Sequence, residues 1–461
     1  MSGIERVKEL LVNNKLEDWD IYTQKVREAE VHLRGREVES VRYPLENFGY
    51  TVRVIKERRG GVGLGLAPGN NFSTEGVTRT VNQALKNASL TRLDKYSLPS
   101  AGKYPRVEIK DPAILKDPVN VVLSKAEELR SSLQNDKKVE MTFCKLRTYE
   151  VETSICNSNG LAESKTETFF YLELALKAKA GGKVAEYWPD KYYRRAGDFK
   201  VESDVADWVK LVKDTLDSKL PPTKRMDVVF PPQIVSELLP SVLGYHASGQ
   251  ALYKRLSRFT PGVMVGDEAL TVIDNGLYPY ALNTSPFDDE GSPQQATLLI
   301  EKGLFENYIF DQFYGLMNGE NSTGNGLKRA SSIDQKYPAP ISNSPTNIEI
   351  KPGRWGEEEI IGEVKEGILI RKFAWLDPDP LTSSFGSEIR NGYLIRNGEI
   401  TGSVKGGQIS GHVLDASLGN GEIEKGVLNN IFAVSRNQSM EGDAIVPTIG
   451  VRGVQVAGKN R

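Results

Sequence analysis

The chain has few residues of the two types that most often bind zinc or act as nucleophiles. Its 461 residues include 2 cysteines and 3 histidines. Cys144 and Cys156 allow at most one disulfide, which excludes a secreted disulfide scaffold and a zinc site made of four thiolates. Both cysteines lie in strand-like segments with no histidine close in sequence, so we expect buried structural thiols.

Long apolar runs and an excess of one charge are also absent. No stretch approaches the ~20 apolar residues of a membrane-spanning helix, and the first residues lack the pattern of a signal peptide. Lys plus Arg total 59 and Asp plus Glu total 61, so the net charge is −2. This balance argues against binding to nucleic acid or to an anionic membrane through overall charge. We therefore expect a cytoplasmic protein that does not bind membranes.

Glycine is abundant, with 43 residues, and the hydrophobic fraction of 39% suffices for several cores. Changes in composition and in the pattern of predicted helices and strands along the chain predict three units. These are an N-terminal α+β domain over 1–92, a middle α+β domain over 117–222 after a proline-containing linker over 93–116, and a C-terminal domain over 223–461. We expect an α+β fold, in which N-terminal α/β-type units with antiparallel sheets precede a glycine-rich, strand-rich C-terminal domain containing one long helix.

Periodicity and turn residues predict the elements of each unit. The first unit has a helix at 4–14, three strands at 18–27, 29–43 and 49–57, and a helix at 74–88. The second has helices at 117–134 and 202–218 and two long strands that meet at the turn Asn157–Gly160. The third has a helical pattern over 231–259, in which Pro240 could kink or split the helix, and a hairpin at Asn397-Gly398.

A glycine cluster at 58–71 could suggest a phosphate-binding loop. A Walker loop requires a Lys-Ser/Thr pair that opens a helix, and a dinucleotide loop requires GxGxxG between a strand and a helix. Neither pattern is present, and Pro68 and Asn70-Asn71 interrupt the run. A hairpin or strand edge is the better interpretation.

Residues with catalytic potential are scattered. His32, His246 and His412 lie far apart at no metal-ligand spacing, and no GxSxG nucleophile motif occurs. The acidic run Asp288-Asp289-Glu290 could bind a hard cation such as calcium or magnesium. It could equally cap a helix, order a turn or be solvated. These alternatives to a metal site are favoured, because further oxygen ligands at a set spacing are missing.

Several segments after residue 225 occur in an order that resembles the C-terminal domain of the TldD/PmbA family. They are SGQALYKR, LTVIDNGLYP, SPFDDEGSP, LLIEKGLFENYIFD, STGNG and EIRNGYLIRNGEITGSVKGGQISG. Near the N-terminus, GYTVRVIKERRGGVGLGLAPGN followed by a helix is similar to the first domain of that family. The resemblance covers nearly the whole chain, and it rests on the ordered combination rather than on any single segment.

The family contains two kinds of subunit. TldD-like members carry HExxxH on the helix that contains SGQAL, and a cysteine further on, as the metal ligands of a metallopeptidase. TldE-like members, also called PmbA, lack these residues. Alignment to the family helix places Tyr245 at the first histidine, His246 at the glutamate and Gln250 at the second histidine. A shift of one residue also leaves a single histidine, and the segment 439–443 has no cysteine.

The resemblance therefore implies a TldE-type subunit without catalytic residues, metal ligands or a cofactor of its own. It implies a heterodimer with a TldD-like metallopeptidase subunit that holds zinc or another divalent metal, around a cavity partly walled by this chain. The implied substrates are unfolded or small peptides. Candidate contacts to substrate in that cavity are Tyr245, Gln250, Asp288, Asp289 and Glu290. An unpaired chain could form a homodimer through the same surface.

Two other functions remain open at this level. One is a self-contained hydrolase or peptidase that uses the 288–290 carboxylates with His246. The other is a non-enzymatic binding or regulatory module, in line with the family's older description as a gyrase modulator. The near-neutral net charge disfavours direct DNA binding, although the segment Lys56–Arg59 is locally basic.

Overall fold

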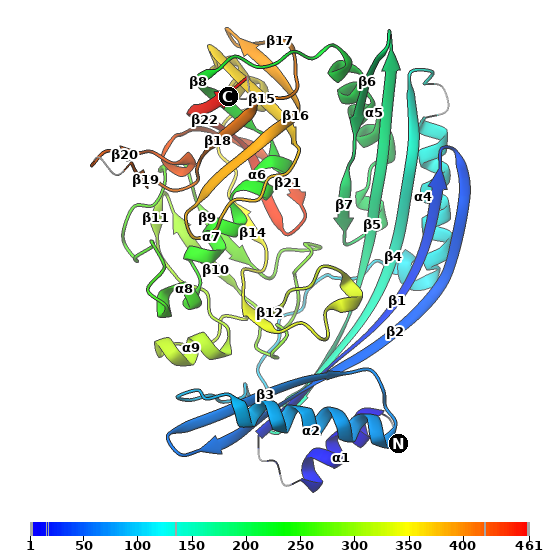
Figure 1. Cartoon of the computed structure of the whole chain (residues 1–461), viewed down its shortest axis with the longest axis vertical. Helices are drawn as coiled ribbons and strands as arrows, with labels where there is room; N and C mark the ends of the chain where they lie inside the picture. Colours follow the sequence, from blue (N-terminus) through cyan, green and yellow to red (C-terminus); the bar gives the residue numbers. More distant parts are fainter. Residues whose placement is uncertain (1–2, 15, 17, 134–135, 419–420, 459–461) are drawn as a thin grey trace.

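The computed structural model describes residues 3–14, 16, 18–133, 136–418 and 421–458. The extreme ends of the first and last predicted units, residues 1–2 and 459–461, lie outside the described residues. Within the described part, most of the strands belong to two large sheets, and short helices pack against them (Figure 1). The expected α+β class and the strand-rich character of the C-terminal region are confirmed.

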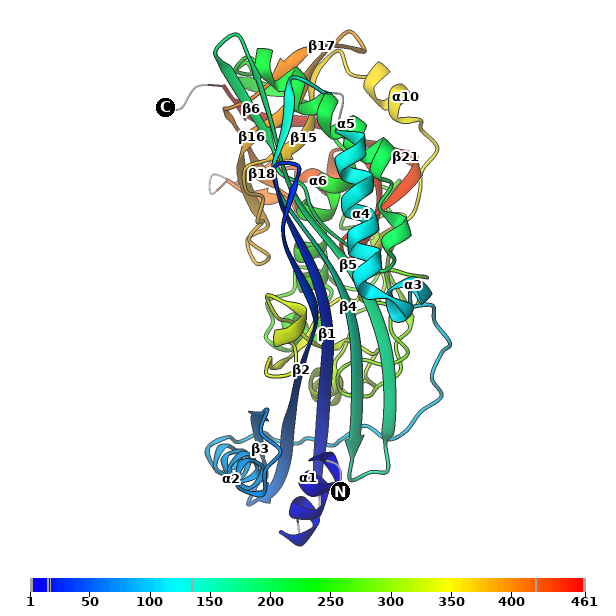
Figure 2. The same ribbon diagram turned by 90° about the vertical axis from the view of Figure 1, so that its right-hand side faces the viewer.

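The first sheet is long, antiparallel and curved, and its longest strands run almost the whole length of the molecule (Figure 2). The strand order is β3-β2-β1-β4-β5-β6, and β7 pairs with β5. The strands are β1 (Asp18–Arg34), β2 (Glu37–Arg58), β3 (Gly61–Gly69), β4 (Val139–Asn157), β5 (Ala162–Ala180), β6 (Lys183–Tyr187) and β7 (Asp190–Tyr193). Strands of the predicted units 1–92 and 117–222 thus share one sheet, because β1 pairs with β4 along its length.

The prediction of three strands between residues 18 and 57 is wrong. The segment forms two longer strands, β1 and β2, joined by a turn at Gly35, where φ is +60°. This turn lies inside the run that was expected to be a single strand over 29–43. A glycine can adopt this left-handed conformation without steric cost, so the hairpin reverses there. The later glycine cluster also forms a hairpin, as expected, between β2 and β3.

Helices cover the long sheet in two groups, one at each end (Figure 2). Near the N-terminus, α1 (Gly3–Asn13) and α2 (Thr74–Leu90) share a core with β1–β3. At the other end, α4 (Pro118–Ser132) and α5 (Val201–Asp214) share a core with β4 and β5, and α5 also contacts the C-terminal domain, where the Tyr393 hydroxyl donates to Asp214 at 2.8 Å. Between the two groups, residues 95–111 form an irregular connection that ends at the short α3 (Pro112–Lys116).

The second sheet builds the C-terminal domain and partly closes on itself. Its strand order is β11-β10-β9-β14-β22-β18-β16-β15-β8, and an additional pairing of β22 with β8 completes a ring of strands. The strands are β8 (Lys224–Phe230), β9 (Val272–Asn275), β10 (Ala296–Glu301), β11 (Leu304–Phe305), β14 (Ile348–Ile350), β15 (Glu366–Phe373), β16 (Ser384–Arg396), β17 (Glu399–Val404), β18 (Gln408–His412), β21 (Ile431–Glu441) and β22 (Ala444–Ala457). Side chains of the ring and of neighbouring segments form the largest apolar core of the described residues.

Short elements complete the C-terminal domain. Two small hairpins pair β12 (Gly326–Lys328) with β13 (Ile341–Asn343) and β19 (Ala416–Ser417) with β20 (Ile423–Glu424). Two further helices are α9 (Gln312–Asn318) and α10 (Glu357–Gly362). None of the helices formed by the described residues is both long enough and apolar enough to cross a membrane.

The expected single long helix of the C-terminal domain is divided into three. The helices are α6 (Pro232–Leu238), α7 (Pro240–His246) and α8 (Gly249–Tyr253). Pro240 has no N–H to continue the first helix, which therefore ends at the preceding turn. Ser248 then has an extended backbone, and its hydroxyl accepts a hydrogen bond from the N–H of Ala251 as the N-cap of α8. The apolar pattern correctly predicted helical structure in this segment, but Pro240 and the N-cap at Ser248 divide it into separate helices.

Candidate functional site

The residues aligned with the family's metal motif lie on two different helices. Tyr245 and His246 end α7, and Gln250 lies in the first turn of α8. The backbone N–H of Gln250 donates a hydrogen bond to Oδ1 of Asn343, 3.0 Å away. The Tyr245 ring meets the His246 ring edge-on, with 5.2 Å between the centroids. The break between the two helices separates the motif positions, and the expectation that Tyr245 and Gln250 contact a peptide stays a prediction.

His246 is a core residue. Its side chain is fully buried, its ring lies 5.4 Å from that of Phe259, and its Nδ1 accepts the backbone N–H of Arg258 at 3.2 Å. Burial, with the nearby charge of Arg258, lowers the pKa of His246 to about 4. The imidazole is therefore neutral at pH 7, and its contacts are those of a packed side chain.

The acidic run 288–290 is buried, and its carboxylates point in different directions. Asp288 accepts hydrogen bonds from the backbone N–H groups of Glu290, Ser292 and Gly326, at 2.9–3.0 Å. Burial and the charge of Glu290 raise the pKa of Asp288 well above its ordinary value. Asp289 accepts the backbone N–H of Lys328 at 2.8 Å. These contacts hold the turn and dock the β12 hairpin onto it.

Glu290 belongs to a second group of buried charges, which we call the junction network: Asp20, Arg53, Tyr96 and Glu290. Arg53 of β2 donates to Glu290 Oε1 at 2.7 Å and also forms an ion pair with Asp20 of β1. The Tyr96 hydroxyl, from the connection after α2, donates to the same Oε1 at 2.8 Å. Arg53 is therefore flanked by two carboxylates and stays charged. The network ties the long sheet and the connection to the C-terminal domain.

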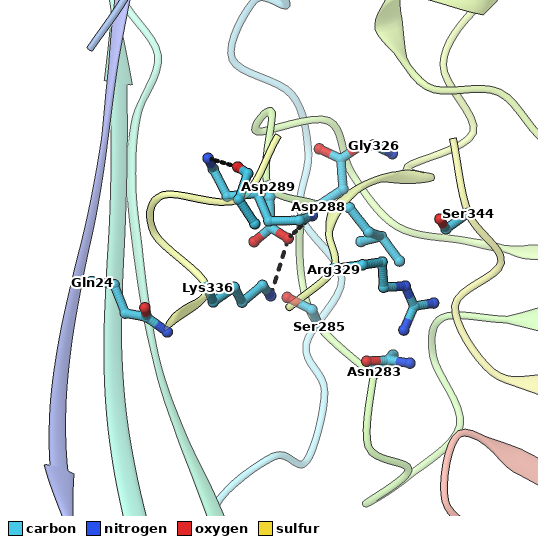
Figure 3. A network of polar contacts seen from close by, with 12 residues as sticks. Gln24, Asn283, Ser285, Asp288, Asp289, Gly326, Arg329, Lys336 and Ser344 are labelled. Carbon is cyan, nitrogen blue, oxygen red and sulfur yellow. Dashed lines mark hydrogen bonds and ion pairs between the residues drawn. The ribbon is translucent and has the colours of Figure 1, made fainter. Parts of the chain in front are cut away.

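A cavity of about 380 Å³ lies between the long sheet and the C-terminal domain. The sheet contributes side chains of β1, β4 and β5, and the C-terminal domain contributes the segments 282–285 and 327–336 and the turn 442–443. Figure 3 shows Gln24 on the sheet side, and Lys336, Arg329, Asn283 and Ser285 opposite it. The long sheet and the β12–β13 hairpin thus form opposite walls.

Charged side chains gather in this cavity, and we call them the cavity cluster: Lys165, Glu167, Arg194, Asp289, Lys328, Arg329, Lys336 and Asp443. Glu167 contacts both Lys165 at 3.4 Å and Arg194 at 3.0 Å. Lys165 also donates to Ser285 Oγ at 2.6 Å. Lys336 pairs with Asp289 at 3.0 Å, as Figure 3 shows. Charges of both signs are thus interleaved in a largely buried space.

The pKa values of the cluster follow from burial and from neighbouring charges. Burial lowers the pKa of Lys328 to about 8, and it lowers that of Lys165 despite the attraction of Glu167. Burial by itself would raise the pKa of Asp289, but Lys336 and Lys165 outweigh it and hold the pKa below its ordinary value. Repulsion among the lysines adds to the shifts of both Lys165 and Lys328. Burial is thus the main cause of the lowered pKa values of both lysines.

Apart from Asp289, sequence reasoning did not identify the residues of the cavity cluster. Lys165, Glu167 and Phe169 alternate along β5 and so share one face of the sheet, which is the face that lines the cavity. Charged residues at alternate strand positions normally indicate a solvated face, and only the position of the C-terminal domain shows that this face is buried. In the described part of the chain, no group of three or more His, Cys, Asp and Glu side chains is arranged to hold a metal ion.

The family follows from comparison with known proteins. The profile of the PmbA/TldA metallopeptidase C-terminal domain matches residues 223–458, and the profile of domain 1 of that family matches residues 19–88. The chain belongs to this family of metallopeptidase-like proteins, which is the TldD/PmbA family, so the predicted family is confirmed. The matched ranges include most of the hairpin β1–β2 and nearly all of the C-terminal domain.

Individual relatives and solved structures agree with this assignment. A metalloprotease of Methanocaldococcus jannaschii is 26% identical over 446 residues, which are 90% of this chain and 91% of the relative. A metalloprotease TldD homolog of Haemophilus influenzae is 24% identical over 61% of this chain and 60% of its own length. The crystal structure of TldE from Thermococcus kodakarensis superposes with a TM-score of 0.84 at 23% identity, over 99% of this chain and 100% of that one.

A protein of Thermotoga maritima, described as a candidate modulator of a DNA gyrase, has a TM-score of 0.81 at 20% identity, over 99% of both chains. At such identities, the structural matches show a shared fold over the whole chain.

Proposed function

We propose that this chain is the TldE-like, non-catalytic subunit of a heterodimer with a TldD-like metallopeptidase, and that the pair degrades or processes peptides. The partner holds zinc or another divalent metal and the general base, and this chain contributes to the wall around the substrate. One metal ion suffices for hydrolysis, because it both lowers the pKa of a bound water and polarises the scissile carbonyl. The second subunit then needs no ligands of its own.

The main support for this proposal is that the residues aligned with the HExxxH motif cannot bind a metal or act as the general base. A tyrosine and a glutamine replace the two histidines, and the position of the glutamate is taken by His246, which is buried and neutral. Neither a carboxylate base nor an imidazole pair is therefore available on α7 and α8. The names of relatives as metalloproteases and as TldD homologs support a metal elsewhere in the assembly.

The contacts of the acidic run do not favour a self-contained hydrolase. Asp288 is engaged by three backbone N–H groups, Asp289 by Lys336 and a backbone N–H, and Glu290 by Arg53 and Tyr96. A catalytic carboxylate must reach substrate or water, whereas these three are between 1% and 3% exposed. The run therefore connects the long sheet to the C-terminal domain through these contacts.

Metal content and peptidase activity test the proposal. The chain is purified alone and mixed with a TldD-like chain from the same source, and each sample is analysed for bound metal and for cleavage of an unfolded peptide. We expect no metal and no turnover from this chain alone, and turnover in a one-to-one complex. The control is a complex whose TldD-like subunit carries glutamine in place of the HExxxH glutamate. Stoichiometric metal in the isolated chain, or cleavage by it, would contradict the proposal.

Sedimentation of the same samples distinguishes the assemblies. We expect the mixture to sediment as a heterodimer. A homodimer of the unpaired chain that dissociates when the partner is added fits the proposal, because both assemblies would use the same surface. A chain that remains separate from the partner at every ratio would count against it.

A further inference from the structure

The cavity between the long sheet and the C-terminal domain carries more positive than negative charge. Its lining includes four basic and two acidic side chains: Lys165, Lys328, Arg329, Lys336, Glu167 and Asp443. Glu167 is already shared with the buried Arg194, which lies behind the lining. An excess of positive charge around a cavity favours a ligand of the opposite sign, and an anionic ligand would compensate it.

Two of these basic side chains retain donors for a ligand. Within the described part of the chain, the Lys336 ammonium has one close acidic partner, Asp289 at 3.0 Å. The Arg329 guanidinium donates to Asp443 at 3.4 Å and to the carbonyl of Pro345. An ammonium has three N–H donors and a guanidinium has five, so both groups can donate further hydrogen bonds. In Figure 3, Ser285 lies between these two side chains.

A buried amide on the same lining lacks a partner. Gln294 is 4% exposed and lines the cavity, and its side-chain oxygen forms no hydrogen bond with the described residues. Buried polar groups are nearly always hydrogen-bonded, so this unpartnered amide at the cavity wall can become a contact for a polar ligand group once its side chain rotates toward the cavity. An amide offers both a donor and an acceptor, which suits a peptide group.

One part of the cavity lining, which we call the apolar wall, is formed by Val151, Phe169 and Tyr192 of the long sheet and by Ile333 of the segment 327–336. These four side chains belong to one cluster of packed apolar side chains. They face the same space as the basic side chains of the segment 327–336. The cavity therefore has a cationic wall, an apolar wall and an unpartnered amide. Its volume lies in the ~300–1,000 Å³ range of small-ligand sites.

We propose that this cavity binds a carboxylate attached to an apolar group, as at the C-terminus of a peptide that ends in an apolar residue. Lys336 and Arg329 receive the carboxylate, the apolar wall receives the side chain, and Gln294 bonds to the preceding peptide group. The carboxylate and the apolar group follow from the lining, whereas a peptide as their source rests on the proposed function. An acidic side chain within a peptide is the other source of the same chemistry.

A free phosphate fits the lining less well. It would use the basic side chains, but it would leave the apolar wall and the amide without a function. Arginine and lysine bind both anions, so the apolar wall is what distinguishes them. Phosphate is therefore a suitable negative control.

Calorimetric titration of the full chain, without any partner, tests the site. The ligands are acetyl-Ala-Ala-Leu with a free carboxylate, the same peptide as its C-terminal amide, acetyl-Ala-Glu-Leu amide and inorganic phosphate. We expect the free acid to bind about tenfold or more tightly than the amide, because charge-assisted hydrogen bonds are lost with the carboxylate. If the glutamate peptide amide matches the free acid, the site keeps its chemistry and the source is an acidic side chain.

Variants then assign the binding to this cavity. Arg329→Gln and Lys336→Gln should each weaken binding of the free acid about tenfold and leave the weak binding of the amide unchanged. Lys351→Gln is the matched control, because Lys351 also pairs with one carboxylate, that of Glu349 at 2.6 Å, and does not line the cavity. Arg329 is 38% exposed, so its replacement keeps the test valid if the Lys336 variant folds poorly.

Several results would overturn the inference. They are equal binding of acid and amide, binding of phosphate as tight as that of the free acid, no binding by the folded wild-type chain, and unchanged binding in both variants. These outcomes are separable from failure of the proposed function. A chain that binds no carboxylate but still supports turnover by the partner loses this site and keeps its function. A chain that binds the free acid but supports no turnover keeps the site and loses the function.

Discussion

The junction network and the cavity cluster lie on the two sides of one short turn and differ in how their charges are balanced. In the junction network, Arg53 lies between Asp20 and Glu290, and the Tyr96 hydroxyl completes the contacts. In the cavity cluster, basic side chains outnumber acidic ones around an accessible space. The neighbouring residues Asp289 and Glu290 belong to different groups, since Asp289 pairs with Lys336 of the cavity cluster and Glu290 pairs with Arg53 of the junction network.

The difference separates a structural role from a binding role. A closed set of buried charges stabilises one arrangement of the long sheet against the C-terminal domain, and it leaves no donor for a ligand. An unbalanced set beside a cavity is suited to a ligand of the opposite sign. If this distinction is correct, substitutions in the first group should affect stability more than binding, and substitutions in the second group should do the reverse.

The largest expected effect is that of Arg53→Met. It leaves the buried carboxylates of Asp20 and Glu290 without their shared cation, and removal of one partner from a buried pair costs about 3–5 kcal/mol. Denaturant unfolding should show this loss as a lower midpoint. Lys25→Met is the control, because Lys25 forms an exposed pair with Glu46 at 3.3 Å, and such pairs contribute about 0–1 kcal/mol. Equal midpoints for the two variants would show that the network is not structural.

Lys336→Gln tests the cavity cluster, for which a larger effect on binding than on stability is expected. Lys336 is 29% exposed, so the loss of its bond to Asp289 should cost only about 1–2 kcal/mol, less than the loss of Arg53. Carboxylate binding, by contrast, should fall about tenfold in this variant. Unfolding and titration of the same preparation provide both values. A larger loss of stability than in Arg53→Met would reverse the proposed roles of the two groups.

Asp311→Asn tests the edge of the junction network through pH. Burial, followed by the charge of Glu290, raises the pKa of Asp311 to about 7. Between pH 4 and pH 7 the folded chain keeps a proton that the unfolded chain, with a carboxyl pKa of about 3.9, has released. This contribution to stability is therefore present at low pH and is lost as pH rises through that range.

The wild-type chain should accordingly lose part of its stability between pH 4 and pH 7, and Asp311→Asn should lose less. Asparagine keeps the capping oxygen that accepts the N–H of Tyr314, 2.7 Å from Asp311 Oδ1, so the start of α9 is preserved. Thermal unfolding at the two pH values measures both slopes. Identical slopes would show that Asp311 titrates as an ordinary carboxyl.

His246→Leu should have the smallest effect on stability of these variants. It tests a residue of the degenerate motif, which lies outside both charged groups. The backbone N–H of Arg258 loses its acceptor, at a cost of about 1 kcal/mol, and support of partner turnover should not change. The pH dependence has the opposite sign to that of Asp311. The folded imidazole has a pKa of about 4, so the wild-type chain loses stability as pH falls from about 6.5 toward 4. The variant should lack this acid-side loss, and a drop in turnover at pH 7 would give His246 a functional role.

Local signals in the sequence identified much of the fold and its family. Asn157–Gly160 was recognised as the turn between β4 and β5, Pro118 as the start of a helix, and the cluster around Gly61 as a hairpin. The strands between residues 18 and 57 were divided wrongly, because the turn at Gly35 lies within an apparently continuous strand. The helix at 231–259 was too long, because Ser248 caps a new helix within the same apolar pattern.

The candidate site divides in the same way between sequence and tertiary structure. The sequence alone shows that Tyr245, His246 and Gln250 replace the HExxxH residues, and the types of these residues decide whether the helix can bind a metal. The sequence alone does not show the cavity, because Lys165 on β5 and Lys336 after β12 are 171 positions apart and meet only when the C-terminal domain packs on the long sheet. Sequence determines which charges exist, and burial and proximity, which arise only in the folded chain, decide which of them are neutralised and which are free to bind.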